Sequence, residues 1–188
     1  RHDGQAVTCE DWLAAMADAN RVDLSDFAPW YAQAGTPRVT VTSRQDGDVV
    51  HITLAQQVPP TPGQPSKRPV HMPFRLALIG RHSGKRLGAD HLVELRGAET
   101  RISFTGIAEP ALLSLNRGFS APVIVDAPYS RGDLAFLARA DDDPFARWEA
   151  MQQLALAVLA TDDDPAELVQ AVAATLADPT LDAAFKGE

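Results

Sequence analysis

The hydrophobic pattern of this 188-residue chain changes period twice, and this change constrains its fold more than any other feature. Apolar residues recur every three or four positions in residues 1–35, at every second position in residues 36–128, and again every three or four positions in residues 129–188. A period near 3.6 is typical of amphipathic helices, and a period of 2 is typical of half-buried strands. The sequence therefore predicts a mixed fold, an all-β domain flanked by two all-α segments.

Residues 1–35 predict two short helices. Thr8 can cap the first helix and Ser25 the second, while Gly35 stands where a C′ glycine would end the second. Side chains at helical spacing give each helix an apolar face, formed by Trp12, Leu13 and Met16 in the first and by Phe27, Trp30 and Tyr31 in the second. Helices this short are marginally stable alone, so we expect another part of the protein to cover these faces.

Residues 36–128 predict six or seven short strands separated by turns that contain Gly or Pro. In VVHITLA, residues Val50, Ile52 and Leu54 share one face, and HMPFRLALI aligns Met72, Phe74, Leu76 and Leu78 in the same way. The other strand segments are RVTVT, HLVEL, TRISF and APVIVD. Short alternating strands at this density are typical of an Ig-like antiparallel β-sandwich.

Residues 129–188 predict a series of helices. Ser130 can cap a helix that runs to about residue 140, and Asp143-Pro144, Asp164-Pro165 and Asp178-Pro179 can each begin another, with Asp as N-cap and Pro at the first helical position. Helices 144–160 and 165–177 carry apolar stripes typical of a stacked superhelical array. Because such arrays bury each layer against a neighbour, we expect an exposed apolar patch and self-association through these helical faces.

Composition excludes several classes of protein. The net charge is −8 and the basic residues are scattered, which disfavours a nucleic-acid surface. The longest apolar run, in MQQLALAVLATDDD, is far shorter than the ~20 residues of a membrane-spanning helix, so we expect no membrane partner. The single cysteine excludes an internal disulfide and a thiolate metal cluster, and it favours a reducing compartment such as the cytoplasm.

No group of residues predicts catalytic chemistry. The histidines form neither a His-Glu-x-x-His motif nor any helical i,i+4 pair; they are His2, His51, His71, His82 and His91. Cys9 lies at an expected helix N-terminus, where a thiol can become reactive, but we interpret it as a passive side chain. The aspartate runs at 140–145 and 161–166 could attract Ca²⁺ or Mg²⁺, yet helix capping accounts for both Asp-Pro pairs. We therefore assign no catalytic, cofactor-binding or metal-ligating residue.

The segment VPPTPGQPSKRP, residues 58–69, has two interpretations. Its P-x-x-P spacing is found in polyproline II ligands of SH3-type grooves. Its position between two predicted strands and its glycine favour instead a stiff surface loop. Both interpretations stay open, and the first would make this segment a docking site.

Four stretches, RHDGQAVTCEDW, WYAQAGTP, GFSAP and DPFARWEA, resemble in order the segment that follows the catalytic domain in bacterial aminopeptidase N, the zinc-dependent alanyl aminopeptidases of the gluzincin type. The resemblance implies that residues 1–35 are the last catalytic-domain helices, 36–128 a complete sandwich domain, and 129–188 the first helices of a C-terminal helical domain. It also accounts for the opening RHDGQAVT, which we expect to lie within a longer polypeptide. Tyr31 and Tyr129 are the only tyrosines, and neither matches the family's transition-state tyrosine.

The function that the resemblance implies is that of a non-catalytic inter-domain fragment. The parent enzyme would be a metallo-aminopeptidase that removes N-terminal amino acids from peptides, with zinc held upstream and no cofactor in this chain. Its partners would be the remaining domains of the parent polypeptide and the peptide substrates of that enzyme. Two alternatives stay open: a stand-alone sandwich that binds a peptide or a sugar, and an assembly scaffold that docks through residues 58–69.

Overall fold

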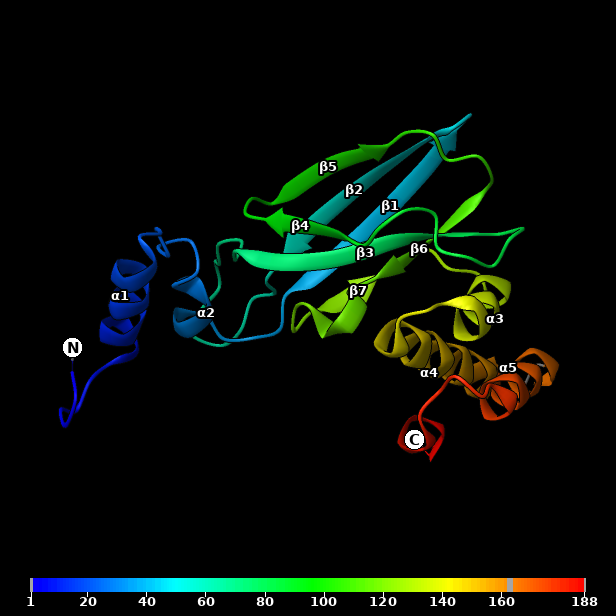
Figure 1. Ribbon diagram of the computed structural model, residues 1–188. Helices are drawn as coiled ribbons and strands as arrows, with labels where there is room; N and C mark the ends of the chain where they lie inside the picture. The colour runs from blue at the N-terminus through cyan, green and yellow to red at the C-terminus, as the bar shows by residue number, and fades with distance from the viewer. Residues whose placement is uncertain (1, 162–163, 188) are drawn as a thin grey trace.

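The computed structural model describes residues 2–161 and 164–187, and its elements follow the three stretches of the sequence (Figure 1). Two short helices come first, α1 (Cys9–Asn20) and α2 (Pro29–Ala32). The strands are β1 (Arg38–Asp46), β2 (Val49–Gln57), β3 (Met72–Gly80), β4 (His91–Leu95), β5 (Glu99–Phe104), β6 (Ala111–Leu115) and β7 (Ile124–Asp126). A 3-10 turn (Arg117–Phe119) separates β6 from β7, and the chain ends with α3 (Arg131–Ala140), α4 (Pro144–Thr161), α5 (Ala166–Ala177) and α6 (Ala183–Gly187).

The strands form a two-layered sandwich, as the period-2 pattern predicts. One sheet has the order β5-β2-β1-β7 and the other the order β4-β3-β6. The hairpin between β1 and β2 pairs Asp46 with Val49, and Gly47 in its turn has a φ of 61°, a left-handed conformation that glycine adopts without strain. The predicted inward residues of β2 and β3 are buried between the sheets: Val50, Ile52, Leu54, Met72, Phe74, Leu76 and Leu78.

Two features of the sandwich differ from the prediction. Strand β7 pairs with β1 in parallel, from Arg38↔Ile124 to Thr40↔Asp126, whereas we expected only antiparallel pairs. Alternation of apolar residues reports which face of a strand is buried but not its direction, so the sequence pattern could not reveal this. The pattern also missed β6, because its residues are buried on both faces: Leu113 faces the sandwich core and Leu112 faces the helices.

The C-terminal helices pack on the outer face of the β4-β3-β6 sheet. Ile79 of β3 and Leu112 of β6 form a second core with Leu134, Leu137 and Ala138 of α3, Ala150, Leu154 and Val158 of α4, and Ala171 of α5. Ser130 caps α3 through a capping box with Asp133, as predicted. Because the end of the sheet at Ile79 and Leu112 is covered on both sides, the sandwich and the helices share a continuous hydrophobic contact there.

The Asp-Pro pairs follow the prediction only in part. Asp143 caps α4, since its Oδ1 accepts the Ala146 N–H at 2.8 Å. Helix α5 begins at Ala166, one residue later than expected, with Pro165 at the N-cap position. The pair Asp178-Pro179 does not begin a helix, because Asp178 is the C-cap of α5 and its carboxylate is held by the N–H and the hydroxyl of Thr180.

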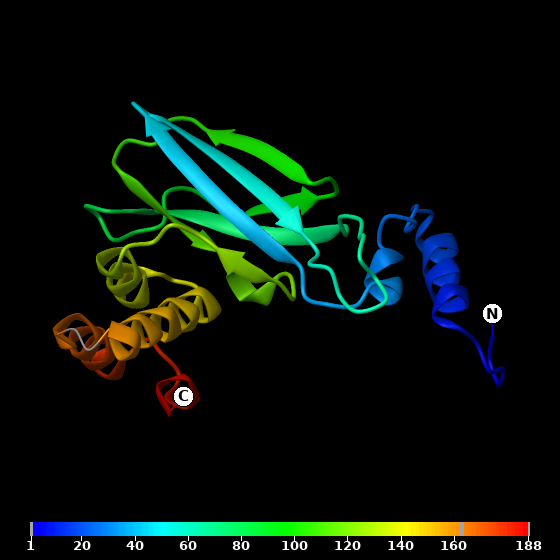
Figure 2. The same cartoon turned by 180° about the vertical axis from the view of Figure 1, so that it is seen from behind.

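The N-terminal helices lie at the end of the sandwich opposite to α3–α5 (Figures 1 and 2). Thr8 caps α1 through a capping box with Asp11, as expected, but no residue of α1 is buried. The predicted cap of the second helix is wrong: the Ser25 N–H donates to Asp23, α2 begins only at Pro29, and Gly35 lies beyond the Gln33 C-cap. Turns at residues 25–28 replace the first helical turn, since a proline is best placed at the start of a helix.

Buried Gln56 holds the chain before β3 in place, and its truncation tests how much this contact stabilises the fold. The Gln56 Oε1 accepts the Val70 N–H at 3.0 Å, and its Nε2 donates to the carbonyls of Val70 at 3.0 Å and Gly97 at 2.8 Å. The Gln56→Ala substitution leaves the buried Val70 N–H without a partner. We expect the free energy of unfolding, measured in urea, to fall by about 1–3 kcal/mol.

The neighbouring residue provides a matched control. Gln57 is exposed on the opposite face of β2 and its side chain makes no hydrogen bond among the described residues. Gln57→Ala should therefore change the free energy of unfolding by less than about 0.5 kcal/mol. Equal losses for the two variants would contradict the role given to Gln56.

Candidate functional site

The histidines and Cys9 are dispersed over the fold. His51 Nδ1 lies 2.8 Å from Ser103 Oγ, His71 Nε2 lies 3.5 Å from Glu94 Oε2, and the His91 ring packs on Phe104 with centroids 4.2 Å apart. Cys9 is exposed in the first turn of α1, and His82 is exposed in a turn. Over residues 2–161 and 164–187, no group of three or more His, Cys, Asp or Glu side chains converges to hold a metal ion.

The proline-rich segment 58–69 is held against the N-terminal linker by its polar groups. Gln64 accepts from the Ala34 N–H and donates to the Ala32 carbonyl, and Lys67 Nζ donates to the Ala34 carbonyl. Gln33 and the backbone of Arg68 exchange two hydrogen bonds, of 2.6 and 2.9 Å. The segment therefore forms a structured loop that fixes the connection between α2 and β1.

The best-defined polar cluster lies at the junction of the sandwich and the helices, and it is centred on Arg117. The Arg117 side chain is 3% exposed. Its Nη1 donates to Asp141 Oδ1 and to Ser114 Oγ, both at 2.8 Å, and its Nη2 donates to Asp142 Oδ1 at 2.6 Å. Its Nε forms a 3.0 Å ion pair with Asp90. One arginine from the turn after β6 thus binds the segment between α3 and α4.

The ionisation of this cluster follows from its burial. Burial raises the pKa of the Asp141 carboxyl, while hydrogen bonds from Ser114 and the Asp143 N–H and the charge of Arg117 oppose that rise. Burial alone would lower the pKa of Arg117, but the hydrogen bond to Asp142 and the charges of Asp141, Asp142 and Asp90 raise it above its ordinary value. Arg117 therefore stays charged, and it compensates the buried carboxylate.

The aspartate run at 140–145 consequently does more than cap a helix. Asp143 caps α4 as predicted and also accepts the Gly118 N–H at 3.1 Å, whereas Asp141 and Asp142 bind Arg117. A run of three carboxylates exceeds what one helix cap needs, and this excess was the sequence signal for a buried partner. In the second run, Asp164 accepts the Ala166 N–H, while Asp162 and Asp163 lie outside the described residues.

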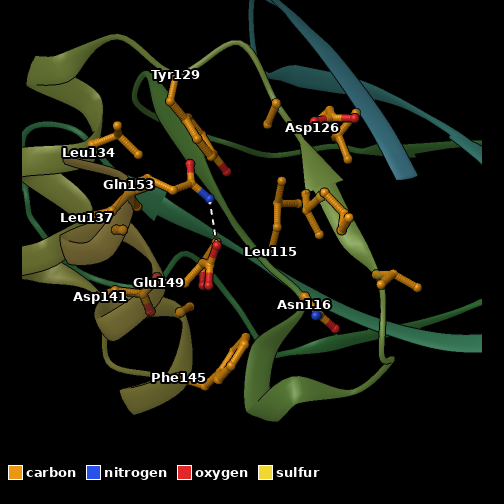
Figure 3. Close-up of a pocket in the computed structure, with 18 of the residues that line it drawn as sticks. Leu115, Asn116, Asp126, Tyr129, Leu134, Leu137, Asp141, Phe145, Glu149 and Gln153 are labelled. Carbon is orange, nitrogen blue, oxygen red and sulfur yellow. Dashed lines mark hydrogen bonds between the residues drawn. The ribbon is translucent and has the colours of Figure 1, made fainter. Parts of the chain in front are cut away.

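A cavity of about 1070 Å³ lies beside this cluster, between β1 and β7 on one side and α3 and α4 on the other. Figure 3 shows Tyr129, Gln153, Glu149 and Phe145 along one side of it, with Leu115 and Asp126 on the other. Gln153 Nε2 donates to Glu149 Oε1 at 2.9 Å. Sequence patterns cannot reveal this cavity, because its walls come from strands and helices that are far apart in the chain.

The tyrosines have structural contacts in this chain. Tyr129 lines the cavity and donates its hydroxyl to the Leu113 carbonyl at 2.7 Å. Burial, together with the charges of Asp141 and Asp133, raises the pKa of Tyr129 well above its ordinary value, so its phenol stays protonated. Tyr31 packs edge-on against Trp12, with ring centroids 6.2 Å apart.

Removing Arg117 tests whether the junction depends on this ion network. The substitution Arg117→Met keeps much of the side-chain volume but leaves Asp141 buried without its cation. Breaking a buried pair in this way costs about 3–5 kcal/mol, so we expect that loss in the free energy of unfolding, measured by urea denaturation. Amide hydrogen exchange should also accelerate in α3 and α4.

Arg101, an exposed arginine, provides the control for Arg117→Met. Arg101 pairs with Glu99 at 2.8 Å on β5, and their side chains are 77% and 47% exposed. Exposed pairs contribute about 0–1 kcal/mol, so Arg101→Met should have little effect. If Arg117→Met proved as mild as Arg101→Met, the junction would not depend on the Arg117 cluster.

Two family descriptions match the chain. Residues 35–128 match the domain of unknown function DUF3458, described as having an Ig-like fold. Residues 131–188 match DUF3458_C, described as ARM repeats. Both agree with the sandwich and the helical array of the structure, and the described residues contain no helix long and apolar enough to cross a membrane.

The chain is similar to curated proteins that share one name, "Aminopeptidase N". The chain is 37% identical over 163 residues to "Aminopeptidase N" of Escherichia coli (strain K12), which covers 82% of this chain and 19% of that protein. It is 38% identical over 162 residues to "Aminopeptidase N" of Caulobacter vibrioides, which covers 86% of this chain and 19% of that protein. The chain therefore spans about a fifth of the length of these relatives.

A solved structure shares the fold. Legionella pneumophila aminopeptidase A, crystallised in complex with aspartic acid, superposes with a TM-score of 0.81 and 27% sequence identity, over 95% of this chain and 21% of that one. Together with the matches above, this confirms the resemblance that the sequence motifs indicate. The chain belongs to the DUF3458 family, whose Ig-like and ARM-repeat domains are the middle and C-terminal regions of aminopeptidase N.

Proposed function

We propose that this chain is a non-catalytic connector within a zinc-dependent aminopeptidase that removes N-terminal amino acids from peptides. In this proposal, residues 1–35 end the catalytic domain, residues 36–128 form the connecting sandwich, and residues 129–188 begin the C-terminal helical domain. The described His, Cys, Asp and Glu side chains do not fit a zinc ion, so zinc would be bound by another part of the parent enzyme. The connector would fix the position of the helical domain relative to the catalytic domain.

The observation that carries the proposal is the junction between the sandwich and the helices. Ile79 of β3 and Leu112 of β6 pack directly on α3 and α4, and Arg117, from the turn after β6, binds the segment between these helices. A buried contact that combines apolar packing with charge-assisted hydrogen bonds resists reorientation. Such rigidity suits a part whose role is to set the geometry between two domains.

Exposed apolar side chains at both ends of the chain also support the proposal. On α1, Trp12 and Met16 are exposed, as the helical pattern predicts for a face that another element should cover. On α4 and α5, the exposed apolar side chains are Leu156, Leu159, Val169, Val172 and Leu176. Neighbouring domains of the parent enzyme would cover these exposed side chains.

The alternative of an assembly scaffold that docks through residues 58–69 has less support than the connector. A docking site for an SH3-type groove needs an accessible polyproline II segment, but Gln64, Lys67 and Arg68 bind the linker at residues 32–34. A partner would have to replace these hydrogen bonds. The connector therefore explains the conformation of residues 58–69 better than the docking site does.

A peptidase assay tests the proposal that this chain is not itself catalytic. With Zn²⁺ added, the pure chain should release no p-nitroaniline from alanine p-nitroanilide above the buffer rate, since hydrolysis of this kind needs a metal-activated water and a general base. Aminopeptidase N of Escherichia coli serves as the positive control. Zinc-dependent turnover by the chain would show that it is itself catalytic.

A second experiment tests the exposed helical patch formed by Leu156, Leu159, Val169, Val172 and Leu176. We expect the chain to self-associate through this patch, because contiguous exposed apolar surface favours association. Substituting Leu156→Glu and Leu159→Glu together should shift the species seen by light scattering towards monomer and reduce binding of a hydrophobic dye. Leu156 and Leu159 are 66% and 79% exposed.

Leu92→Glu is the matched control for this patch, because Leu92 is 59% exposed but lies on β4 of the sandwich. It should leave the oligomeric state unchanged. A wild-type chain that is monomeric at all concentrations and binds little dye would contradict the role of the patch.

A further inference from the structure

We propose that the cavity between the sandwich and helices α3 and α4 binds the basic side chain of an arginine or lysine residue in a short peptide. This proposal goes beyond the connector function and does not depend on it. The cavity has a volume of about 1070 Å³, slightly above the roughly 300–1,000 Å³ typical of ligand pockets, so a side chain and part of a peptide backbone fit within it.

The charge of the cavity selects a cation. Its lining contains three carboxylates, Asp126, Asp141 and Glu149, and no Lys, Arg or His. Asp126 is paired with Arg38 at 3.1 Å and Asp141 with Arg117 at 2.8 Å. These two carboxylates are therefore compensated from outside the cavity.

Glu149 is the carboxylate that a ligand can use. Its Oε1 accepts a hydrogen bond from the neutral amide of Gln153, and its Oε2 has no partner among residues 2–161 and 164–187. The residue is half-buried on α4, and Figure 3 shows its side chain within the cavity. A half-buried carboxylate without a cation attracts a guanidinium or an ammonium group, because charge-assisted hydrogen bonds are the strong ones.

Aromatic rings surround the same space. Phe119 and Phe145 have ring centroids 5.1 Å apart, and Phe145 and Trp148 have centroids 6.0 Å apart. All three line the cavity, as does Tyr129. Cations bind favourably over aromatic faces, and the apolar stem of an arginine or lysine packs against rings of this kind.

The position of Phe119 is conformationally costly, which favours a binding role. Its φ is 52°, in the left-handed region that bulky residues rarely adopt, and Asn116 and Gly118 in the same turn also have positive φ values. The result is an aromatic side chain that is 54% exposed at the cavity. Such strain is found most often where a side chain must be held ready for a ligand.

A pair of matched probes tests the proposal with the full chain. Nα-benzoyl-arginine amide carries the guanidinium, and Nα-benzoyl-citrulline amide is its neutral isostere. In ¹H–¹⁵N spectra, the arginine probe should shift the indole N–H signal of Trp148, and the citrulline probe should bind at least about tenfold more weakly. Trp12 and Trp30, which do not line the cavity, are internal controls whose signals should not move.

Two substitutions locate the interaction. Glu149→Gln keeps the side-chain size and should weaken binding of the arginine probe about tenfold or more, while Glu99→Gln, on β5 away from the cavity, should leave binding unchanged. Phe119→Ala removes an exposed ring and should weaken binding about two- to fivefold. Far-ultraviolet circular dichroism checks that each variant is folded.

The proposal is overturned if the two probes bind equally, because binding would then depend on the benzoyl group alone. It is also overturned if the Trp148 signal does not move, or if folded Glu149→Gln and Phe119→Ala both bind the arginine probe as well as the wild type. None of these outcomes bears on the connector function, which the peptidase assay tests separately.

Discussion

The contact between Arg117 and the segment Asp141–Asp142 is the interaction on which the arrangement of this chain depends. Arg117 comes from the turn after β6, and the two aspartates come from the connection between α3 and α4. Burying charges is costly unless they are paired and hydrogen-bonded, and here Arg117 Nη1 also donates to Ser114 Oγ while its Nε lies 3.0 Å from Asp90 in an ion pair. Because Arg117 and Asp141 are both buried and each compensates the charge of the other, the cluster favours one orientation of the helices on the sandwich.

The β4-β3-β6 sheet links the sandwich core to the helices, because neighbouring residues of β3 and β6 face opposite sides of it. Leu78 of β3 and Leu113 of β6 pack into the sandwich, while Ile79 and Leu112, their neighbours in sequence, pack on the helices. The cavity forms where this packing ends, between the short strand β7 and α4. Its acidic and aromatic lining is therefore held by the same framework that orients the helices, so the proposed connector would also carry the proposed binding site.

The N-terminal side of the chain is connected differently. Helix α1 has no buried residue, whereas α2 contacts the sandwich: Pro29 is buried, Trp30 packs against the sandwich core, and Trp30 Nε1 donates to the His71 carbonyl. The sandwich thus shares a hydrophobic core with the C-terminal helices, while α1 presents an exposed surface. This asymmetry fits the proposed connector of an aminopeptidase, in which residues 1–35 would belong to the catalytic domain.

The class of fold could be predicted from the sequence, because periodicity, capping residues and turn glycines act locally. The faces of β2 and β3 and the caps Thr8, Ser130 and Asp143 agree with that prediction. The sequence could not reveal β6, which is buried on both faces and so does not alternate, or the parallel direction of β7. No local pattern distinguishes Arg117 or Glu149 from other charged residues. Their surroundings depend on the tertiary structure, because burial of a charge and the shape of a cavity arise where segments distant in the chain meet.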